Sequence, residues 1–361
     1  MAFKLAMYPV SYVAQYDPET QKWSESWVQA DSVPFDQLSA MSEKDQNDIY
    51  TNRNIFDLPL VNYTTQYALS CFEGMKAYPQ KDGSICLFRP DRNAERFYNS
   101  MKGLKTTPFP QEMYLKASKE FIRKNRELGY MPTYNPEWEK DRFASASAVY
   151  MRPFMYSEAA IGIGVSLAPY VVICATTVSS YFKSTNSKAI VTDRIRATPK
   201  GTGWIKCASN YVTSTLAKKE AEDAGFMEVI FLDATKRKYI EEGSSCNIFF
   251  YLKNGVLVTP ELGDTVLPGI TRSSIIDFAR AEGITVCERK ISIKEALSKS
   301  RECFVTGTAA GIGSIESITW KGKETVFNDR KPGELGTKLQ AMLKGTQYGT
   351  VTDTKGWNVP V

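Results

Sequence analysis

Lys206 ends a glycine-containing segment, Gly201–Lys206 (GTGWIK), and precedes residues that could begin a helix. Tyr211 follows five residues later. A lysine amine acts as a nucleophile toward carbonyl groups when its surroundings favour the neutral form. A single lysine in such a place is usually a solvated surface charge, so its chemistry depends on the groups that accompany it.

Three downstream segments carry groups that could act with Lys206. Glu241 and Glu242 precede a glycine and two serines, so the backbone there can approach another molecule closely. Gly269-Ile270-Thr271 is typical of a helix start, where backbone N–H groups favour an anion. Thr308-Ala309 is a second small-residue turn after an apolar run. This combination predicts a site for an anionic, nitrogen-bearing cofactor.

Pyridoxal phosphate is a cofactor whose requirements these groups meet. It needs a lysine for a Schiff base and an acid that keeps the pyridine nitrogen protonated, because only the charged ring withdraws electrons. It also needs a phenol near its ring hydroxyl and N–H groups around its phosphate. Lys206, Glu242 and Tyr211 would supply the first three, and the two small-residue turns the fourth. Each feature alone is weakly specific, and the ordered set is far more so.

The composition excludes several kinds of chemistry and partner. The 361 residues are enough for two domains. The chain contains no histidine, which excludes Ser-His-Asp and Cys-His catalysis and removes the commonest metal ligand. No metal site is predicted. The 45 basic and 40 acidic residues are interleaved without a basic stripe, so nucleic-acid binding is not indicated.

Cysteines and apolar runs indicate the compartment. The seven cysteines are scattered and include no C-x-x-C pair, which argues against a disulfide framework or a zinc site. The N-terminal residues lack the pattern of a signal or transit peptide. No apolar run reaches the roughly 18 residues that a membrane span requires. We therefore expect a cytoplasmic protein without membrane contact.

Apolar periodicity predicts strands and helices in both halves of the chain. Strands are expected over residues 67–78 (a pair), 83–88, 146–154, 170–177, 189–194, 228–232, 239–258 (a pair turned at Asn254-Gly255) and 302–306. Helices are expected over residues 90–104, 111–128, 211–224, 272–281 and 332–344. Residues 348–361 are predicted to be an irregular cover.

A polar segment divides these elements into two groups. The run SSYFKSTNSK (179–188) contains the predicted interdomain linker, residues 181–188. We expect an α/β chain, α+β within each half. A small domain would cover residues 1–180 and a large cofactor-binding domain residues 189–361.

Seven motifs occur here in the order found in the fold-type IV pyridoxal-phosphate enzymes. They are FEGMKAY (72–78), LFRPDRNAERF (87–97), YMRPF (150–154), KCASNY (206–211), EEGSSCN (241–247), LPGITR (267–272) and TGTAA (306–310). Within that family the chain resembles the branched-chain amino-acid aminotransferases, over roughly residues 50–315. LPGITR and FEGMKAY are the most specific of the seven motifs.

The resemblance implies cofactor roles for the matched residues. Lys206 would be the Schiff-base lysine and the proton carrier, and Tyr211 would hold the ring hydroxyl. Glu242 would pair with the pyridine nitrogen, since it precedes Asn247 by five residues as in the family's E-x-x-x-x-N pattern. The residues that would bind the phosphate are Arg96, Ile270, Thr271 and Thr308.

The resemblance also implies a substrate wall. Its predicted members are Tyr67, Phe72, Tyr150 and Arg152, with Thr308 and Ala309 at the substrate carboxylate. Phe72 and Tyr150 suit an aliphatic side chain, and Arg152 suits the distal carboxylate of glutamate. The alternative is that these aromatic residues belong to the core and that Arg96 forms an exposed helical ion pair.

The activity implied by the family is transamination between leucine, isoleucine or valine and 2-oxoglutarate. The small-molecule partners would be amino acids and 2-oxo acids, the cofactor would lie in an interdomain cleft, and the chain would form at least a homodimer. Cys207-Ala208-Ser209 replaces the usual glycine-rich run, and Trp204 and Ile205 are bulkier than expected. The preference among the three substrates therefore stays open.

Four alternatives remain from the sequence. A D-amino-acid aminotransferase and an aminodeoxychorismate lyase are usually shorter and lack FEGMKAY and Y-x-R-P-F in this form. An NAD(P)-dependent oxidoreductase is suggested by residues 304–313, but that fingerprint should open a helix, and residues 314–320 look extended. A binding protein without catalysis is disfavoured by the intact Lys206.

Overall fold

The computed structural model describes residues 7–30, 41–42, 45, 58–178 and 187–361, and the chain divides into two compact units. The first unit groups Met1–Tyr181 with Lys206–Ser209 and Gly345–Val361, and the second contains Phe182–Ile205 and Asn210–Lys344. Residues 181–186 of the predicted linker lie outside the described residues. We predicted one boundary between two continuous domains, whereas Lys206–Ser209 groups with the first unit.

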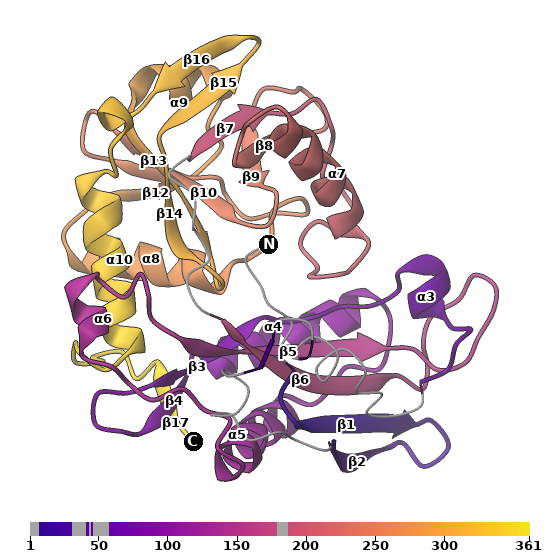
Figure 1. The fold of residues 1–361 in the computed structure, drawn as a ribbon. Helices are drawn as coiled ribbons and strands as arrows, with labels where there is room; N and C mark the ends of the chain where they lie inside the picture. The colour runs from indigo at the N-terminus through magenta and orange to yellow at the C-terminus, as the bar shows by residue number, and fades with distance from the viewer. Residues whose placement is uncertain (1–6, 31–40, 43–44, 46–57, 179–186) are drawn as a thin grey trace. The chain divides into compact units, whose positions relative to one another are not determined.

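The first unit is built on a seven-stranded antiparallel sheet (Figure 1). The strand order is β17-β4-β3-β5-β6-β1-β2. In chain order the strands are β1 (Val10–Asp17), β2 (Lys22–Gln29), β3 (Met75–Pro79), β4 (Ile85–Phe88), β5 (Ala148–Tyr156), β6 (Tyr170–Val178) and β17 (Asn358–Pro360).

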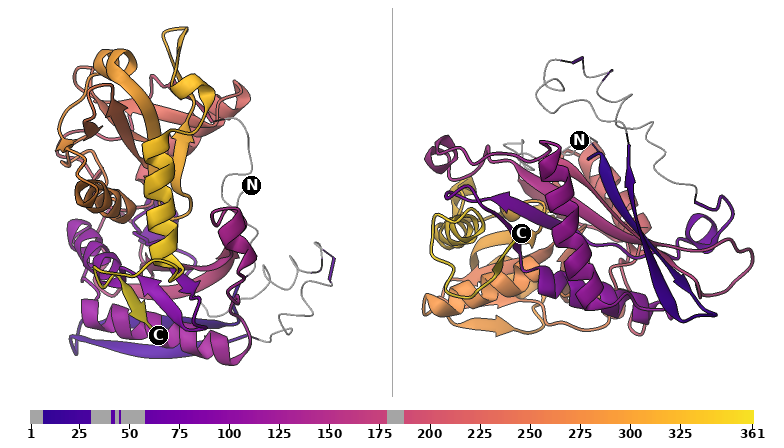
Figure 2. Two further views of the ribbon diagram at one scale, coloured as in Figure 1. Left: turned by 90° about the vertical axis from the view of Figure 1, so that its left-hand side faces the viewer. Right: turned by 90° about the horizontal axis from the view of Figure 1, so that it is seen from below.

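Two amphipathic helices pack on this sheet, as Figure 2 shows from two further sides. They are α4 (Pro90–Gly103) and α5 (Gln111–Glu127), close to their predicted bounds. Phe97 and Met101 of α4 and Phe121 of α5 are fully buried against strands of the sheet. This apolar spacing holds the polar face of α4 that carries Arg96 in a defined register. Two short helices, α3 (Tyr63–Tyr67) and α6 (Glu137–Lys140), complete the unit.

Two predictions for the first unit were wrong in detail. Residues 67–78 do not form a strand pair: Tyr67 ends α3, and Cys71 and Phe72 form only isolated bridges before β3 begins. The tail is not wholly irregular, because β17 pairs with β4, with Val359 opposite Leu87. Pairing across such a distance in sequence leaves no local periodic signal.

The second unit contains two five-stranded sheets, ordered β12-β11-β10-β13-β14 and β16-β15-β7-β8-β9. Their strands are β7 (Lys188–Val191), β8 (Glu228–Leu232), β9 (Ile240–Gly243), β10 (Asn247–Leu252), β11 (Leu257–Thr259), β12 (Val286–Glu288), β13 (Ser300–Gly307), β14 (Gly311–Ile315), β15 (Ser317–Trp320) and β16 (Lys323–Val326). The helices are α7 (Asn210–Asp223), α8 (Ile270–Ala281), α9 (Ile293–Lys299), α10 (Glu334–Gln347, assigned to the first unit from Gly345) and the 3-10 turn η1 (Asn328–Arg330).

Strand β8 shows how the sequence builds this core. Val229 and Phe231 pack against α7, while Ile230 and Leu232 point into the cluster shared with β10 and β13. Alternate residues of a strand face opposite sides, so an apolar run is buried on both. The predicted Asn254-Gly255 turn joins β10 to β11, as expected.

The segment after β13 tests the hypothesis that the chain is an NAD(P)-dependent oxidoreductase. Residues 308–310 form a turn, and Gly311–Ile315 returns as β14, antiparallel to β13. A nicotinamide-binding fingerprint would open a helix here. The predicted α/β class is confirmed, and the oxidoreductase hypothesis fails at this strand. Within the described residues, no helix is long and apolar enough to cross a bilayer.

Candidate active site

Lys206 is held by the backbone of the first unit. Its carbonyl accepts a hydrogen bond from the Phe72 N–H at 3.1 Å, and its own N–H donates to Ser100 Oγ at 3.2 Å. The next residue, Cys207, forms an isolated antiparallel bridge with Cys71. Lys206 is half-buried, and its Nζ lies 4.8 Å from the centroid of the Phe72 ring. The amine is therefore fixed against an aromatic surface.

Phe72 also faces Arg152. The guanidinium carbon of Arg152 is 4.7 Å from the Phe72 ring centroid and 5.3 Å from that of Tyr150. Arg152 Nη2 donates to the Tyr150 hydroxyl at 3.2 Å. A side chain at Gly74 would overlap this hydroxyl, so only glycine leaves room for it. The structure thus brings together three of the four predicted wall residues with Lys206.

Arg152 is half-buried, and its charge partners differ from those of Arg96, Arg196 and Arg272, which each pair with a glutamate. In the described part of the chain no carboxylate pairs with it, and its buried Nε has no hydrogen-bond partner. A partly buried cation without a counterion favours an anionic ligand. Tyr67, the fourth predicted wall residue, is 47% exposed at the end of α3.

Arg96 forms a buried ion pair rather than an exposed helical one. Its Nε and Nη2 donate to the two oxygens of Glu73 at 2.7 and 2.8 Å. Glu73 is fully buried, and the Arg96 side chain is 10% exposed. Sequence reasoning missed the role of Glu73, although its place within FEGMKAY was a usable signal.

In the second unit, the adjacent residues Glu241 and Glu242 of β9 have different hydrogen-bond partners. Glu242 accepts hydrogen bonds from Asn247 Nδ2 at 3.1 Å and from the Leu267 N–H at 3.3 Å. Glu241 instead accepts from Thr265 Oγ1 at 2.6 Å. Because only Glu242 contacts Asn247, the geometry agrees with the choice of Glu242 over Glu241.

Arg196 is a residue that sequence reasoning missed. It forms a buried ion pair with Glu242, and its Nη2 also donates to the carbonyls of Gly203 (2.9 Å) and Thr265 (2.7 Å). Arg196 thereby connects the glycine-containing segment before Lys206 with the strand that bears Glu242. No local pattern distinguishes Arg196 from Arg194, which pairs at the surface with Glu220.

Asn247 joins three of the predicted segments. Besides Glu242, its side chain contacts the Leu267 carbonyl at 3.0 Å. A Cβ at Gly269 would overlap Asn247 Oδ1, which explains why glycine precedes α8. Across the sheet, Asn247 is paired with Thr306, at the end of the strand that leads to Thr308. The acid, the helix start and the second turn are thus neighbours.

Helix α8 begins at Ile270 with Gly269 as its N-cap residue. In this described helix, no side chain caps the N-terminus and no acidic residue stands in the first turn. The N–H groups of Ile270 and Thr271 are therefore placed where a helix favours an anion. Thr308 and Ala309 lie half-buried in the turn between β13 and β14.

Tyr211 lies in the first turn of α7 and is half-buried. The preceding Asn210 fixes this turn: its side chain donates to the carbonyls of Thr202 (2.8 Å) and Ile205 (2.9 Å). The residue on each side of Lys206–Ser209 is thus held to the same loop. Because Tyr211 follows Asn210 directly, these hydrogen bonds also fix the position of its backbone.

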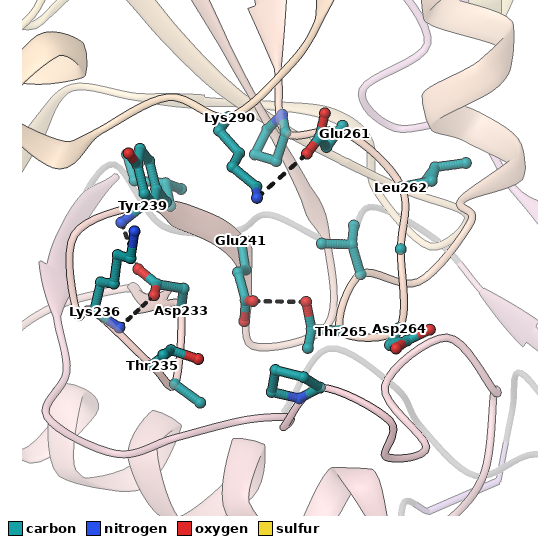
Figure 3. Close-up of a pocket in the computed structure, with 16 residues that line it drawn as sticks. Asp233, Thr235, Lys236, Tyr239, Glu241, Glu261, Leu262, Asp264, Thr265 and Lys290 are labelled. Carbon is teal, nitrogen blue, oxygen red and sulfur yellow. Dashed lines mark hydrogen bonds and ion pairs between the residues drawn. The ribbon is translucent and has the colours of Figure 1, made fainter.

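A cavity of about 370 Å³ lies on the Glu241 side of β9 (Figure 3). Glu241, Thr265, Glu261 and Lys290 are among its lining residues, whereas none of the predicted cofactor or substrate residues is. Burial raises the pKa of Glu241. The cavity is therefore lined by Glu241 and not by Glu242 or the other predicted site residues.

Comparison with known proteins shows the family of this chain. Residues 70–318 match the family described as amino-transferase class IV. A "Probable branched-chain-amino-acid aminotransferase" of Staphylococcus aureus (strain MRSA252) is 37% identical over 305 residues, covering 82% of this chain and 81% of that protein. The "Branched-chain-amino-acid aminotransferase 2" of Bacillus subtilis (strain 168) is 35% identical over 304 residues, covering 82% and 80%.

A solved structure is similar over most of its length. The branched-chain aminotransferase of the thermophilic archaeon Thermoproteus uzoniensis, solved with norvaline, has a TM-score of 0.72 and 27% identity. The match covers 85% of this chain and 95% of that one. The resemblance inferred from seven motifs is confirmed: this chain belongs to the class IV aminotransferases and, among them, to the branched-chain-amino-acid aminotransferase family.

Proposed function

We propose that this protein is a pyridoxal-phosphate-dependent aminotransferase that exchanges the amino group between leucine, isoleucine or valine and 2-oxoglutarate. The observation that carries the proposal is the surface around Phe72, where Lys206 Nζ and the guanidinium of Arg152 face one aromatic ring. Among the described residues, no carboxylate pairs with this arginine. The amine of Lys206 lies beside both an apolar surface and a cation. This combination suits two substrates, one with an aliphatic side chain and one with a carboxylate.

The residues present fit the cofactor. Glu242, held by Arg196 and Asn247, offers a carboxylate for a protonated pyridine nitrogen. The start of α8, which no side chain caps, offers N–H groups for a phosphate. Further proposed ligands are Arg96 and Thr308 for the phosphate and Tyr211 for the ring hydroxyl. When bound, the cofactor supplies an electron-withdrawing ring for the carbanion formed at the substrate α-carbon.

The proton transfers fall to Lys206. The chain contains no histidine, and Lys206 Nζ would move a proton from the substrate α-carbon to the cofactor's C4′ in the first half-reaction and in the opposite direction in the second. Phe72 would exclude water from one side of this amine. The backbone of Lys206 is hydrogen-bonded to Phe72 and Ser100, which would keep this residue in place between the two half-reactions.

The substrate wall accounts for dual specificity. Phe72 and the ring of Tyr150 would contact the aliphatic side chains of the branched-chain amino acids. Arg152 would bind the distal carboxylate of glutamate or 2-oxoglutarate by a charge-assisted hydrogen bond. Thr308 and Ala309 would meet the α-carboxylate common to all substrates.

We also propose a homodimer in the cytoplasm. In the first unit, Leu60, Ile161, Ile163 and Leu167 are between 60% and 100% exposed, and the Ala160 N–H donates to the Val61 carbonyl, so these loops are neighbours. Exposed apolar residues gathered in this way suit a subunit interface. All seven cysteines are free thiols, which suits a reducing compartment.

Visible spectroscopy of the purified protein tests the activity. With pyridoxal phosphate we expect an absorption band that changes on adding L-leucine and is restored by 2-oxoglutarate. Lys206→Ala should lose turnover, whereas Lys200→Ala, an exposed lysine in the same loop, should keep it. Normal turnover in Lys206→Ala, or a response to D-alanine but not to L-leucine, would overturn the proposal.

A further inference from the structure

Glu73 makes contacts that exceed those of a simple ion pair. Both its oxygens are bound by the Nε–Nη2 edge of Arg96, and Oε2 also accepts from Asn93 Nδ2 at 2.6 Å and from the Gly74 N–H at 3.2 Å. The carboxylate is fully buried. A bidentate pair of this kind fixes the plane of the guanidinium as well as its distance.

Stability alone is a weak reason for such a pair. Removing two charges from water costs so much that well-packed apolar residues often serve as well or better. Here the cost is offset only because every contact is a hydrogen bond to the charged form. The feature that apolar side chains could not reproduce is the fixed direction of Arg96.

The same segment also positions Lys206. The Glu73 N–H donates to the Pro153 carbonyl at 2.7 Å, and the adjacent Phe72 N–H donates to the Lys206 carbonyl. Ser100, one helical turn after Arg96 on α4, accepts from the Lys206 N–H. Arg96 and Lys206 are therefore connected twice, once through residues 72–73 and once through α4 itself.

We infer that Glu73 is a positioning residue that sets the guanidinium of Arg96 at a fixed place relative to the amine of Lys206. This inference rests on the proposed function, in which Arg96 binds the cofactor's phosphate and Lys206 its carbonyl carbon. One cofactor must reach both groups, so a shift of Arg96 would weaken phosphate binding or misplace the carbonyl. Glu73 acts only through Arg96.

The experiment compares two ligands, pyridoxal phosphate and pyridoxal, which lacks the phosphate. Their dissociation constants are measured by titrating protein freed of cofactor, for the wild type and Glu73→Gln. We expect Glu73→Gln to weaken pyridoxal phosphate by about 10- to 100-fold, the range seen for outer partners of metal ligands. The affinity for pyridoxal should stay nearly unchanged, and phosphorus NMR of the bound cofactor should shift.

A double-mutant cycle tests whether Glu73 acts through Arg96. In the Arg96→Leu background, Glu73→Gln should cause no further loss of phosphate-dependent affinity, because coupled residues are non-additive. Additive losses would overturn the inference, as would equal weakening of both ligands, which indicates general structural damage. Tighter binding of pyridoxal phosphate would mean that Glu73 merely neutralises Arg96.

Two further variants keep the test decisive. Asn93→Ala removes one donor to Glu73 and should give a smaller loss with the same preference for the phosphorylated ligand; it replaces Glu73→Gln if that variant does not fold. Glu302→Gln changes another buried carboxylate, which binds the N–H groups of Leu335 and Gly336, and should leave the ratio of affinities unchanged. If the wild type binds no pyridoxal phosphate, the proposed function itself fails.

Discussion

Arg196 and Glu242 form an ion pair in which both side chains are almost fully buried, with 6% and 5% of their surfaces exposed. The arginine reaches Glu242 from the segment that leads to Lys206 and also binds two backbone carbonyls. Breaking one partner of a buried pair leaves an uncompensated charge. The pair therefore links the stability of the second unit to the proposed cofactor site.

Arg196→Leu should lower the free energy of unfolding by about 3 to 5 kcal/mol, the cost of leaving Glu242 unpaired. Urea denaturation measures this loss. Arg194→Leu removes a partner of Glu220 two residues away, where both side chains are exposed, and should change stability little. Similar losses in the two variants would show that the burial of Arg196 has no special effect.

Glu242→Gln should keep cofactor binding but reduce kcat by several orders of magnitude, since a neutral ring is a poor electron sink. Glu241→Gln is the matched control, because Glu241 contacts Thr265 and not Asn247. Steady-state kinetics with L-leucine and 2-oxoglutarate measure kcat of both variants. If Glu241→Gln is the slower variant, the role of the pyridine-nitrogen partner belongs to Glu241.

Arg152→Leu should reduce kcat/KM for 2-oxoglutarate and glutamate by about tenfold to a hundredfold, the value of one charge-assisted hydrogen bond. The values for leucine should change much less, because its side chain carries no charge. Arg92→Leu, on the exposed face of α4, serves as the control. Equal losses for both substrate types would make Arg152 structural.

Gly269→Ala should displace Asn247 and lower the free energy of unfolding by about 1 to 3 kcal/mol, as overpacking does. It should also slow turnover, since Asn247 holds Glu242. Gly263→Ala, in the same loop with open space around its Cα, should be tolerated. Thermal unfolding and kcat measured on both variants check this difference.

Lys344 gives a pH-dependent prediction. Burial lowers its pKa to about 8 from 10.5, so the unfolded chain binds more protons between these values. Stability should therefore rise as the pH increases through this window, and the full cost of the buried charge applies below it. Lys344→Met should lose this rise, because methionine binds no proton. Unfolding titrations at pH 7 and pH 10 distinguish the two chains.

The sequence by itself predicted the elements that have a strong local period. Helices α4 and α5 and strand β8 lie within a residue or two of their expected bounds, because their apolar residues recur at the spacing of a buried face. The ordered motifs around Lys206 and Glu242 were enough to name the family. Gly269-Ile270-Thr271 marked the start of α8, because these residues are typical of a helix start.

Only the tertiary structure decided which charges meet. Glu73 and Arg96 are 23 residues apart, and Arg196 and Glu242 come from a loop and a strand with no shared pattern. Nor could the sequence show that β17 completes the first sheet, or that Arg152 meets no carboxylate within the part of the chain that the structure describes. A buried charge pairs with whatever the folded chain brings beside it, and that proximity is a property of the packed chain rather than of local spacing.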